Sequence, residues 1–392
     1  MNWFIIAFFI LSISLFLITH YYRLKQTISY EQIEAFETEE TLSISQKLLK
    51  YHNITIKYLD TEQAKNLIIK IKNGEYINGM NQANLSARGC VSIDDLYNKY
   101  LNGFENITDD EKAKVEKFIY KLLNEIKAKT GTNAGAKADE NAGTKYYNYV
   151  VKWLQTVSFA KAKSWLESGM PHTLETTIVM DAGWFSKPRK ITLLHEMAHV
   201  HQRQSSFDFE DLYSALGYLY NPVDIRGMNA IYPLNRNNPD GTSKYWLWHL
   251  PNKKDTKDTK DTKDANNTYW WMGAIFKSVE PSSLTDVNLL ALQLEHSDDG
   301  TFYYLKQNPT ALNNLKEFAN FFGDNPNNYH PNEMSAKFAE WYLEDVLRET
   351  DGNGNGNGNG NSILNENTYI YNKHEGYRIY KKYFENMINK YY

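Results

Sequence analysis

The strongest constraint in this sequence is the pattern His-Glu-x-x-His, formed by His195, Glu196 and His199. On a helix, residues four apart lie on one face, so the two histidines can direct their imidazole groups to one point and bind a zinc ion. Glu196 lies about 100° further around the helix, where its carboxylate can take a proton from a water on the metal. Residues 191–200 carry no charge outside the motif, as expected of a buried helix. The other interpretation is a core helix whose histidines face polar groups.

A third ligand is needed, because a catalytic zinc ion has three protein ligands and one open position. Residue 205 is a serine, which excludes a third histidine six residues after His199. Glu333 is the strongest candidate, because Pro331 suits the start of a helix that carries Glu333 and Glu340 on one face. Glu333 could instead be an N-terminal helix carboxylate favoured by the helix dipole. The alternative ligands are Glu340, Asp224 and Glu210.

These two segments resemble the zincin metallopeptidases, and more closely the gluzincins among them. Thr192 lies three residues before the first histidine, as is common in zincins. Glu333 followed by Ala336 is similar to the Glu-x-x-Ala helix of gluzincins. His201 departs from the family, which usually has an apolar residue there, and its place on the helix indicates a surface residue or one that supports a ligand.

The resemblance implies a bound Zn2+ ion and hydrolysis of peptide bonds with Glu196 as the general base. The implied metal ligands are His195, His199 and Glu333. Gluzincin-like enzymes also use a His or Tyr that donates a hydrogen bond to the oxyanion. The candidates for this role are His330, Tyr329, His374 and Tyr377.

The resemblance further implies an α+β fold, with a zincin-like catalytic domain of helices and a small mixed sheet over residues 145–392. Residues 146–167 have the period of an amphipathic helix, and residues 174–180 alternate like a short strand before the metal helix. In zincins a strand in this place forms the edge of the cleft and pairs with extended substrate. Two low-complexity runs, 254–264 and 352–361, are expected to be solvated loops. The first lies between two Trp-rich segments, at residues 246–248 and 270–271, which are expected to be the strands of a hairpin with this run at its tip.

The N-terminal part of the chain is expected to be separate. Residues 3–19 are uncharged and mostly Phe, Ile and Leu, just long enough as a helix to cross a bilayer. We therefore expect residues 1–20 to be a transmembrane helix that forms a single-pass anchor, with a cleaved signal peptide as the alternative. Residues 21–128 are expected to be a helical N-terminal domain or pro-region, joined by a linker, 129–144. Thr108 and Glu111 have the spacing of a capping box, which predicts the start of a helix over residues 108–126. Basic residues after the anchor and Asn-x-Ser/Thr sequons point to opposite orientations in the membrane.

Composition narrows the class of protein further. The net charge is −4 without a basic block, so nucleic-acid binding is not expected. The abundance of Asn, Lys and Ile, with 29 tyrosines, resembles proteins of large DNA viruses and of some protists. Cys90 is the single cysteine, which excludes an intramolecular disulfide framework. A thiolate from a pro-region can block an open zinc position, so Cys90 is either such a latch or a buried bystander thiol.

The sequence thus predicts a membrane-anchored zinc metallopeptidase, in a host or virion membrane, whose substrate is a peptide or protein. One alternative is a catalytically degenerate zincin that serves as a structural or binding protein of a membrane or virion. Another is a zinc hydrolase that acts on a non-peptide amide or on cell-wall material. An open strand edge beside the metal favours extended peptide, whereas a closed pocket favours a small substrate.

Overall fold

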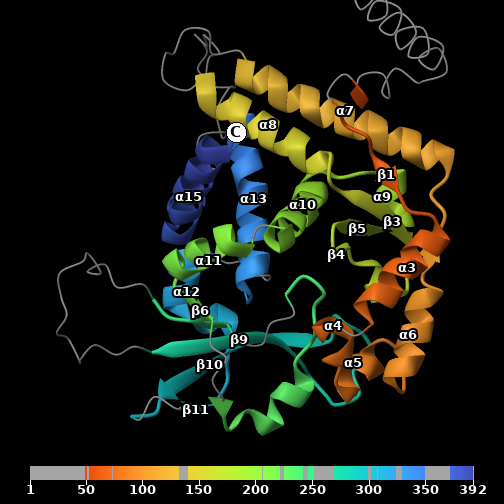
Figure 1. Ribbon diagram of the computed structural model, residues 1–392. Coiled ribbons are helices and arrows are strands. Elements are labelled where there is room, and N and C mark those ends of the chain that lie inside the picture. Colours follow the sequence, from red (N-terminus) through yellow and green to blue (C-terminus); the bar gives the residue numbers. More distant parts are fainter. Residues whose placement is uncertain are drawn as a thin grey trace, which may run out of the picture. The chain divides into compact units, whose positions relative to one another are not determined.

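The structure is a computed structural model. In it the chain forms two compact units, Met1–Asn53 and Ile54–Tyr392. The residues it describes are 49–50, 53–72, 74–131, 140–204, 206–220, 225–241, 246–250, 268–298, 302–306, 308–323, 329–348 and 371–391. All helices and strands named below belong to the second unit (Figure 1).

The first sheet lies beside the candidate metal helix. Its strands are β1 Lys57–Tyr58, β2 Phe104–Glu105, β3 Ser158–Ala162, β4 His172–Leu174 and β5 Thr177–Asp181. Their order is β1-β3-β5-β4, with β2 paired to β3. β1, β3 and β5 are parallel, whereas β4 turns back antiparallel to β5 and forms an edge. Helices pack on both faces of this sheet, so β3 is buried along its whole length.

The structure corrects two sequence expectations in this region. The helix expected over residues 146–167 ends at Leu154, as α8 Glu140–Leu154, and the buried strand β3 follows it. A strand buried on both faces shows no alternation of polar and apolar residues, so the pattern did not reveal it. The single strand expected over residues 174–180 is the end of β4, a turn at Glu175 with φ 53°, and β5. β4, not β5, therefore forms the edge.

The helices form two groups around the sheet. The first group covers one face: α3 Thr61–Ile71, α4 Glu75–Asn78, α5 Gln82–Ala87 and α6 Ile93–Leu101. The second comprises α7 Asp109–Gly131, α8, α9 Ala182–Ser186, α10 Lys190–Gln204, α11 Ser206–Ala215, α12 Lys316–Phe322, α13 Pro331–Arg348 and α15 Glu375–Tyr391. α10 contacts β4 and β5 on one side and α13 on the other. α7 begins with the expected capping box, in which Glu111 N donates to Thr108 Oγ1 at 3.3 Å and Thr108 N donates to Glu111 Oε2 at 2.9 Å.

The second sheet has the order β6-β8-β9-β10-β11-β7, with β12 paired to β10. Its strands are β6 Tyr218–Tyr220, β7 Ile225–Arg226, β8 Trp246–Trp248, β9 Tyr269–Phe276, β10 Val287–His296, β11 Tyr303–Leu305 and β12 Thr310–Ala311. β8 and β9 pair antiparallel, as the sequence predicted for the two Trp-rich segments. Short 3-10 helices complete the fold: η1 Leu166–Gly169, η2 Met228–Ala230, η3 Tyr232–Leu234 and η4 Leu312–Asn314. The low-complexity runs 254–264 and 352–361 lie outside the described residues.

The fold of the described residues is α+β, and the predicted transmembrane helix is not found among them. In the portion of the chain that the structure describes, no helix has both the length and the apolar character to cross a membrane. The longest described helix, α7, has 23 residues and carries charged side chains along its length. Residues 1–20, on which the expectation rested, lie outside the described residues. The prediction of a transmembrane fold and a membrane location is corrected accordingly. The segment between α7 and α8 is shorter than the expected linker, 129–144, because α7 continues to Gly131 and α8 begins at Glu140.

Candidate metal centre

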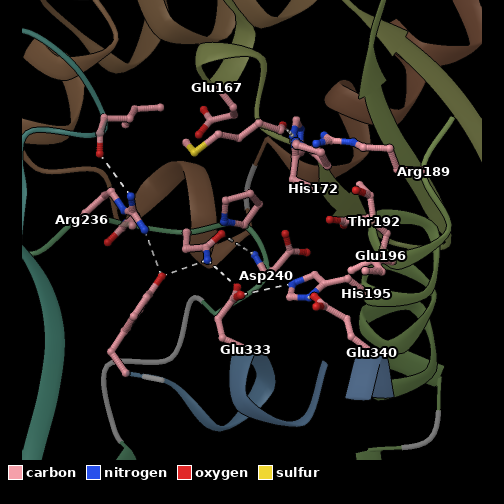
Figure 2. Close-up of a pocket in the computed structure, with 18 residues that line it drawn as sticks. Glu167, His172, Arg189, Thr192, His195, Glu196, Arg236, Asp240, Glu333 and Glu340 are labelled. Atoms are coloured by element: carbon pink, nitrogen blue, oxygen red, sulfur yellow. Dashed lines mark hydrogen bonds and ion pairs between the residues drawn. The ribbon is translucent and has the colours of Figure 1, made fainter. Parts of the chain in front are cut away.

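Two neighbouring helices, α10 and α13, carry the candidate metal ligands. His195 and His199 lie on α10, and Glu333 lies in the first turn of α13. One donor atom of each residue lies within 4.8 Å of the others. Nε2 of His195 is 3.4 Å from Oε2 of Glu333, and Nε2 of His199 is 3.8 Å from Oε1 of the same carboxyl group. Figure 2 shows His195 and Glu333 pointing toward one another.

The three donor atoms fit a zinc ion. Ligands bound to zinc at 2.0–2.2 Å with tetrahedral angles lie roughly 3.3–3.5 Å apart. The 3.4 Å between His195 and Glu333 agrees with this spacing, and the 3.8 Å from His199 to the other carboxyl oxygen is slightly longer. Nε2 of His199 is buried and has no hydrogen-bond partner among the described residues. A buried nitrogen without a partner is costly, and coordination to a metal ion supplies that partner. Two imidazoles and one carboxylate form a donor set that favours zinc.

Hydrogen bonds fix the orientation of both imidazole rings. Nδ1 of His195 is 2.7 Å from Oε1 of Glu340, and Nδ1 of His199 is 2.8 Å from Oε1 of Gln202. Both partners are acceptors, so each Nδ1 carries a proton and each Nε2 offers its lone pair to a metal. Gln202 is held in turn, because its Nε2 donates to Oγ of Ser335 at 2.7 Å. These supporting contacts tie α10 to α13 on both sides of the ligands.

The charges of the metal-free centre balance one another. Burial lowers the pKa of His195, but its hydrogen bonds to Glu333 and Glu340 outweigh burial and raise the pKa well above its usual value. Burial raises the pKa of Glu333, but the hydrogen bond from His195 and the charge of His199 hold it at about 2. At His199 burial dominates and lowers the pKa. Without metal, a proton on His195 therefore neutralises the Glu333 carboxylate, and a cation at this point would take the place of that proton.

Glu196 lies beside the ligands and is only 3% exposed. Oγ1 of Thr173, on β4, donates to Oε2 of Glu196 at 2.9 Å. Burial and then the nearby charge of Asp240 raise the pKa of Glu196 to about 8. Donor atoms of Glu196, His199 and Asp240 also lie within 4.8 Å of one another. The charge of a divalent cation at the ligands opposes both effects and favours the ionised carboxylate that a general base needs.

A loop of residues 237–241 lies against the ligands. Nδ2 of Asn238 donates to Oε1 of Glu333 at 2.6 Å. Oδ1 of Asp240 accepts from the backbone N of Thr173 and from Nη2 of Arg203, each at 3.0 Å. The sequence analysis missed this loop, because Asn-Asn-Pro-Asp-Gly indicates only a turn and lies far from both motifs in sequence. It also missed Gln202, although a polar residue three positions after a ligand on the same helix was a usable signal.

A cavity of about 300 Å3 opens beside the ligands and is drawn in Figure 2. β4, α10, the 237–241 loop and α13 all contribute to its walls. Its lining includes His195, Glu196 and Glu333, together with two arginines, Arg189 and Arg236. The volume is at the lower end of the range for small-ligand sites.

No family model, curated protein or solved structure matches this chain. The resemblance to zincins therefore rests on the residues of the two motifs.

The structure separates the four candidates for the oxyanion-binding role. Tyr329 lines the cavity, and its hydroxyl accepts hydrogen bonds from Arg236 at 3.2 Å and from Asn238 at 3.0 Å. His330 is buried next to it, and its Nδ1 accepts from the backbone N of residue 332 at 3.2 Å. His374 and Tyr377 lie away from the cavity lining: His374 stacks on an aromatic ring of α13, and Tyr377 donates to an aspartate of that helix at 2.5 Å.

The remaining candidates have different places. Glu340 contacts Nδ1 of His195 instead of the point where the ligand atoms meet. Glu210 is exposed on α11, and Asp224 lies outside the described residues.

Cys90 is buried in the apolar cluster under α3–α6 and is not part of the cavity lining. His201 is buried against aromatic rings of α8 rather than exposed, and burial lowers its pKa to about 3.

Proposed function

We propose that this protein is a zinc-dependent peptidase. The observation that carries the proposal is the meeting of His195, His199 and Glu333 within 4.8 Å, beside the buried carboxyl group of Glu196. Each histidine already donates its Nδ1 proton to a fixed acceptor, so Nε2 is the atom offered to the metal. A carboxyl group beside the ligands also supports catalysis, because a purely structural metal site has no use for a base.

The roles of the chain's own residues follow from their contacts. Zinc supplies Lewis-acid chemistry, which polarises a carbonyl group and makes water a stronger acid. Glu196 accepts the proton of the attacking water and delivers it to the leaving amine. Thr173 keeps the Glu196 carboxyl group in one orientation. The Tyr329 hydroxyl accepts both of its hydrogen bonds, so its own proton is not used by these partners, and burial raises its pKa. The hydroxyl donates this proton in a hydrogen bond to the developing oxyanion.

Elemental analysis and peptide cleavage test the proposal on the full-length protein. The variants are Glu333→Ala, Glu196→Gln and the control Glu317→Ala, whose residue is exposed on α12. We expect one zinc per chain in wild type, Glu196→Gln and Glu317→Ala, and a loss of at least tenfold in Glu333→Ala at limiting zinc. Mass spectrometry of a peptide mixture should show cleavage by wild type and Glu317→Ala, and none by Glu196→Gln. A wild type without zinc, or cleavage by Glu196→Gln at the wild-type rate, contradicts the proposal.

A structural zinc site is the second candidate, and one observation favours it. Asp240 has a carboxyl oxygen within 4.8 Å of a donor atom of His199, which makes it the candidate for a fourth protein ligand. Replacement of zinc by Co2+ separates the two candidates through the visible spectrum. A site with an open position changes its spectrum when a hydroxamate is added, whereas a site closed by four protein ligands does not. An unchanged spectrum, together with the absence of peptide cleavage, would favour the structural role.

A further inference from the structure

The charged side chains of the cavity are not equally paired. The acidic residues outside the metal centre already have cationic partners. These pairs are Glu167 with Arg88, Asp240 with Arg203, and Glu340 with Lys337. Arg236 and Arg189 differ from them, because neither forms an ion pair with any described residue. Figure 2 shows Arg236 on one side of the cavity and Arg189 on the other.

Arg236 is held in place although its charge is unpaired. It is half-buried, and its guanidinium donates to the backbone O of Leu284 at 3.1 Å and to the hydroxyl of Tyr329 at 3.2 Å. Both acceptors are neutral, so they orient the group without neutralising it. Arg189 is exposed, and its guanidinium makes no such contacts with the described part of the chain. A guanidinium that is fixed, partly desolvated and without a carboxylate is suited to bind an anionic group of a ligand.

The edge of β4 beside the cavity is already occupied. The backbone N of Thr173, which an added strand would use, donates to Oδ1 of Asp240 at 3.0 Å. The 237–241 loop is anchored there from two further sides. Nδ2 of Asn332 donates to the backbone O of Asp240 at 2.8 Å, and Nη2 of Arg88 donates to the backbone O of Asn237 at 3.2 Å. A long peptide therefore cannot pair with β4 at Thr173 and continue past the metal ligands.

Arg236 is also at a suitable distance from the metal ligands. Its Nη2 bonds to the Tyr329 hydroxyl at 3.2 Å, that hydroxyl accepts from Asn238 at 3.0 Å, and Asn238 donates to Glu333 at 2.6 Å. Together these three contacts keep Nη2 of Arg236 within about 9 Å of Oε1 of Glu333, a span that about two residues of extended chain, roughly 7 Å, can bridge. The cavity of about 300 Å3 is correspondingly small.

From these observations we infer that the site takes the carboxyl-terminal end of a peptide and that Arg236 binds the terminal carboxylate. The inference rests on the proposed function and specifies it: the enzyme releases one or two C-terminal residues. Arg236 is then a substrate-binding residue, while Arg189 contributes positive potential at the cavity mouth without contact to the carboxylate.

Retention of peptides by full-length, zinc-loaded Glu196→Gln protein tests the inference without turnover. The probe is a mixture of N-acetylated tetrapeptides, prepared once with free C-terminal carboxylates and once as C-terminal amides. Bound peptides are measured by mass spectrometry. We expect the free acids to be retained at least tenfold more than the amides. Equal retention of both forms, or no retention of either, overturns the inference.

Further variants in the Glu196→Gln background separate Arg236 from direct carboxylate–metal contact. Arg236→Met should abolish the preference for free acids, Arg236→Lys should keep part of it, and Arg189→Met should change it less than threefold. Arg378→Met, on the exposed face of α15, is the matched control. A preference for free acids that survives Arg236→Met, or a selection of amides with acidic side chains, overturns the inference.

Failure of the inference and failure of the proposed function are distinguishable. Selective retention of free acids, with no hydrolysis by the wild type, refutes the peptidase and leaves the carboxylate site standing. Cleavage of internal bonds in amidated peptides by the wild type supports the peptidase and overturns the C-terminal inference.

Discussion

Acid should destabilise the protein through one buried ion pair, Arg88–Glu167. Nε of Arg88 donates to Oε1 of Glu167 at 2.7 Å, Nη2 donates to Oε2 at 2.8 Å, and the side chains are 4% and 3% exposed. Burial raises the pKa of Glu167, but the charge and hydrogen bonds of Arg88 outweigh it and hold the pKa at about 2, below its ordinary 4.5. Such a carboxyl group stabilises the fold above its unfolded pKa and loses that effect as the pH falls toward its folded pKa. The difference corresponds to roughly 3 kcal/mol at neutral pH, of which about 2 kcal/mol is lost by pH 3.

Urea denaturation of the full chain between pH 7 and pH 3, with a chelator present throughout, measures this effect. Glu167→Gln should be less stable than wild type at pH 7 by about 3–5 kcal/mol, because Arg88 is left buried without its carboxylate. Its free energy of unfolding should then fall less than that of wild type as the pH is lowered. Glu62→Gln, at an exposed glutamate paired with Lys65, is the control and should keep the wild-type slope. Parallel curves for wild type and Glu167→Gln would refute the reasoning.

Three further predictions concern the centre and its surroundings. Glu340→Ala should weaken zinc binding about 10–100-fold in chelator competition, because Nδ1 of His195 loses its acceptor. The control Glu317→Ala should bind zinc as tightly as wild type. Equal zinc affinities of Glu340→Ala and wild type would show that the Glu340 contact does not affect the ligand. Tyr329→Phe should lower kcat about 10²–10³-fold with little change in zinc content, and an unchanged kcat would remove Tyr329 from the oxyanion role. Cys90→Ser should leave peptidase activity unchanged and lower the urea midpoint of unfolding, because the thiol packs in an apolar cluster. An increase in activity would instead support the hypothesis that Cys90 blocks the open zinc position.

The sequence predicted those parts of the fold that depend on neighbouring residues. Pro331 marked the start of α13, the Thr108 capping box marked the start of α7, and the two Trp-rich segments pair as β8 and β9. It failed where tertiary burial decides the structure. β3 is uniformly buried, and β4 and β5 were merged because the short turn at Glu175 carries no Gly, Pro or Asn.

The candidate site divides in the same way. The spacing of His195 and His199 follows from helix geometry, and Glu333 followed from a start signal and a helix face, so these three could be found in advance. The 237–241 loop could not be found, because its approach to Glu333 depends on hydrogen bonds to residues from α5, β4 and α13. His201 was misplaced for a related reason: the face opposite a ligand is exposed only if nothing packs there, and α8 does.

The geometry of the centre also predicts how the fold responds to metal removal. With metal absent, a protonated His195 lies 3.4 Å from the carboxyl group of Glu333 and 2.7 Å from that of Glu340. Lys337 pairs with Glu340, so the two cations still balance the two carboxylates. The hydrogen bond from Gln202 to Ser335 joins α10 to α13 whether or not a metal ion is bound. We therefore expect the chelated protein to keep its far-ultraviolet circular dichroism at pH 7 and to unfold cooperatively, with zinc raising the midpoint by mass action. His195→Leu should bind little zinc and should destabilise the chelated protein, because it leaves Glu333 buried without a cation. A chelated wild type that unfolds outright would contradict this account, since it would mean that a proton on His195 cannot replace the metal.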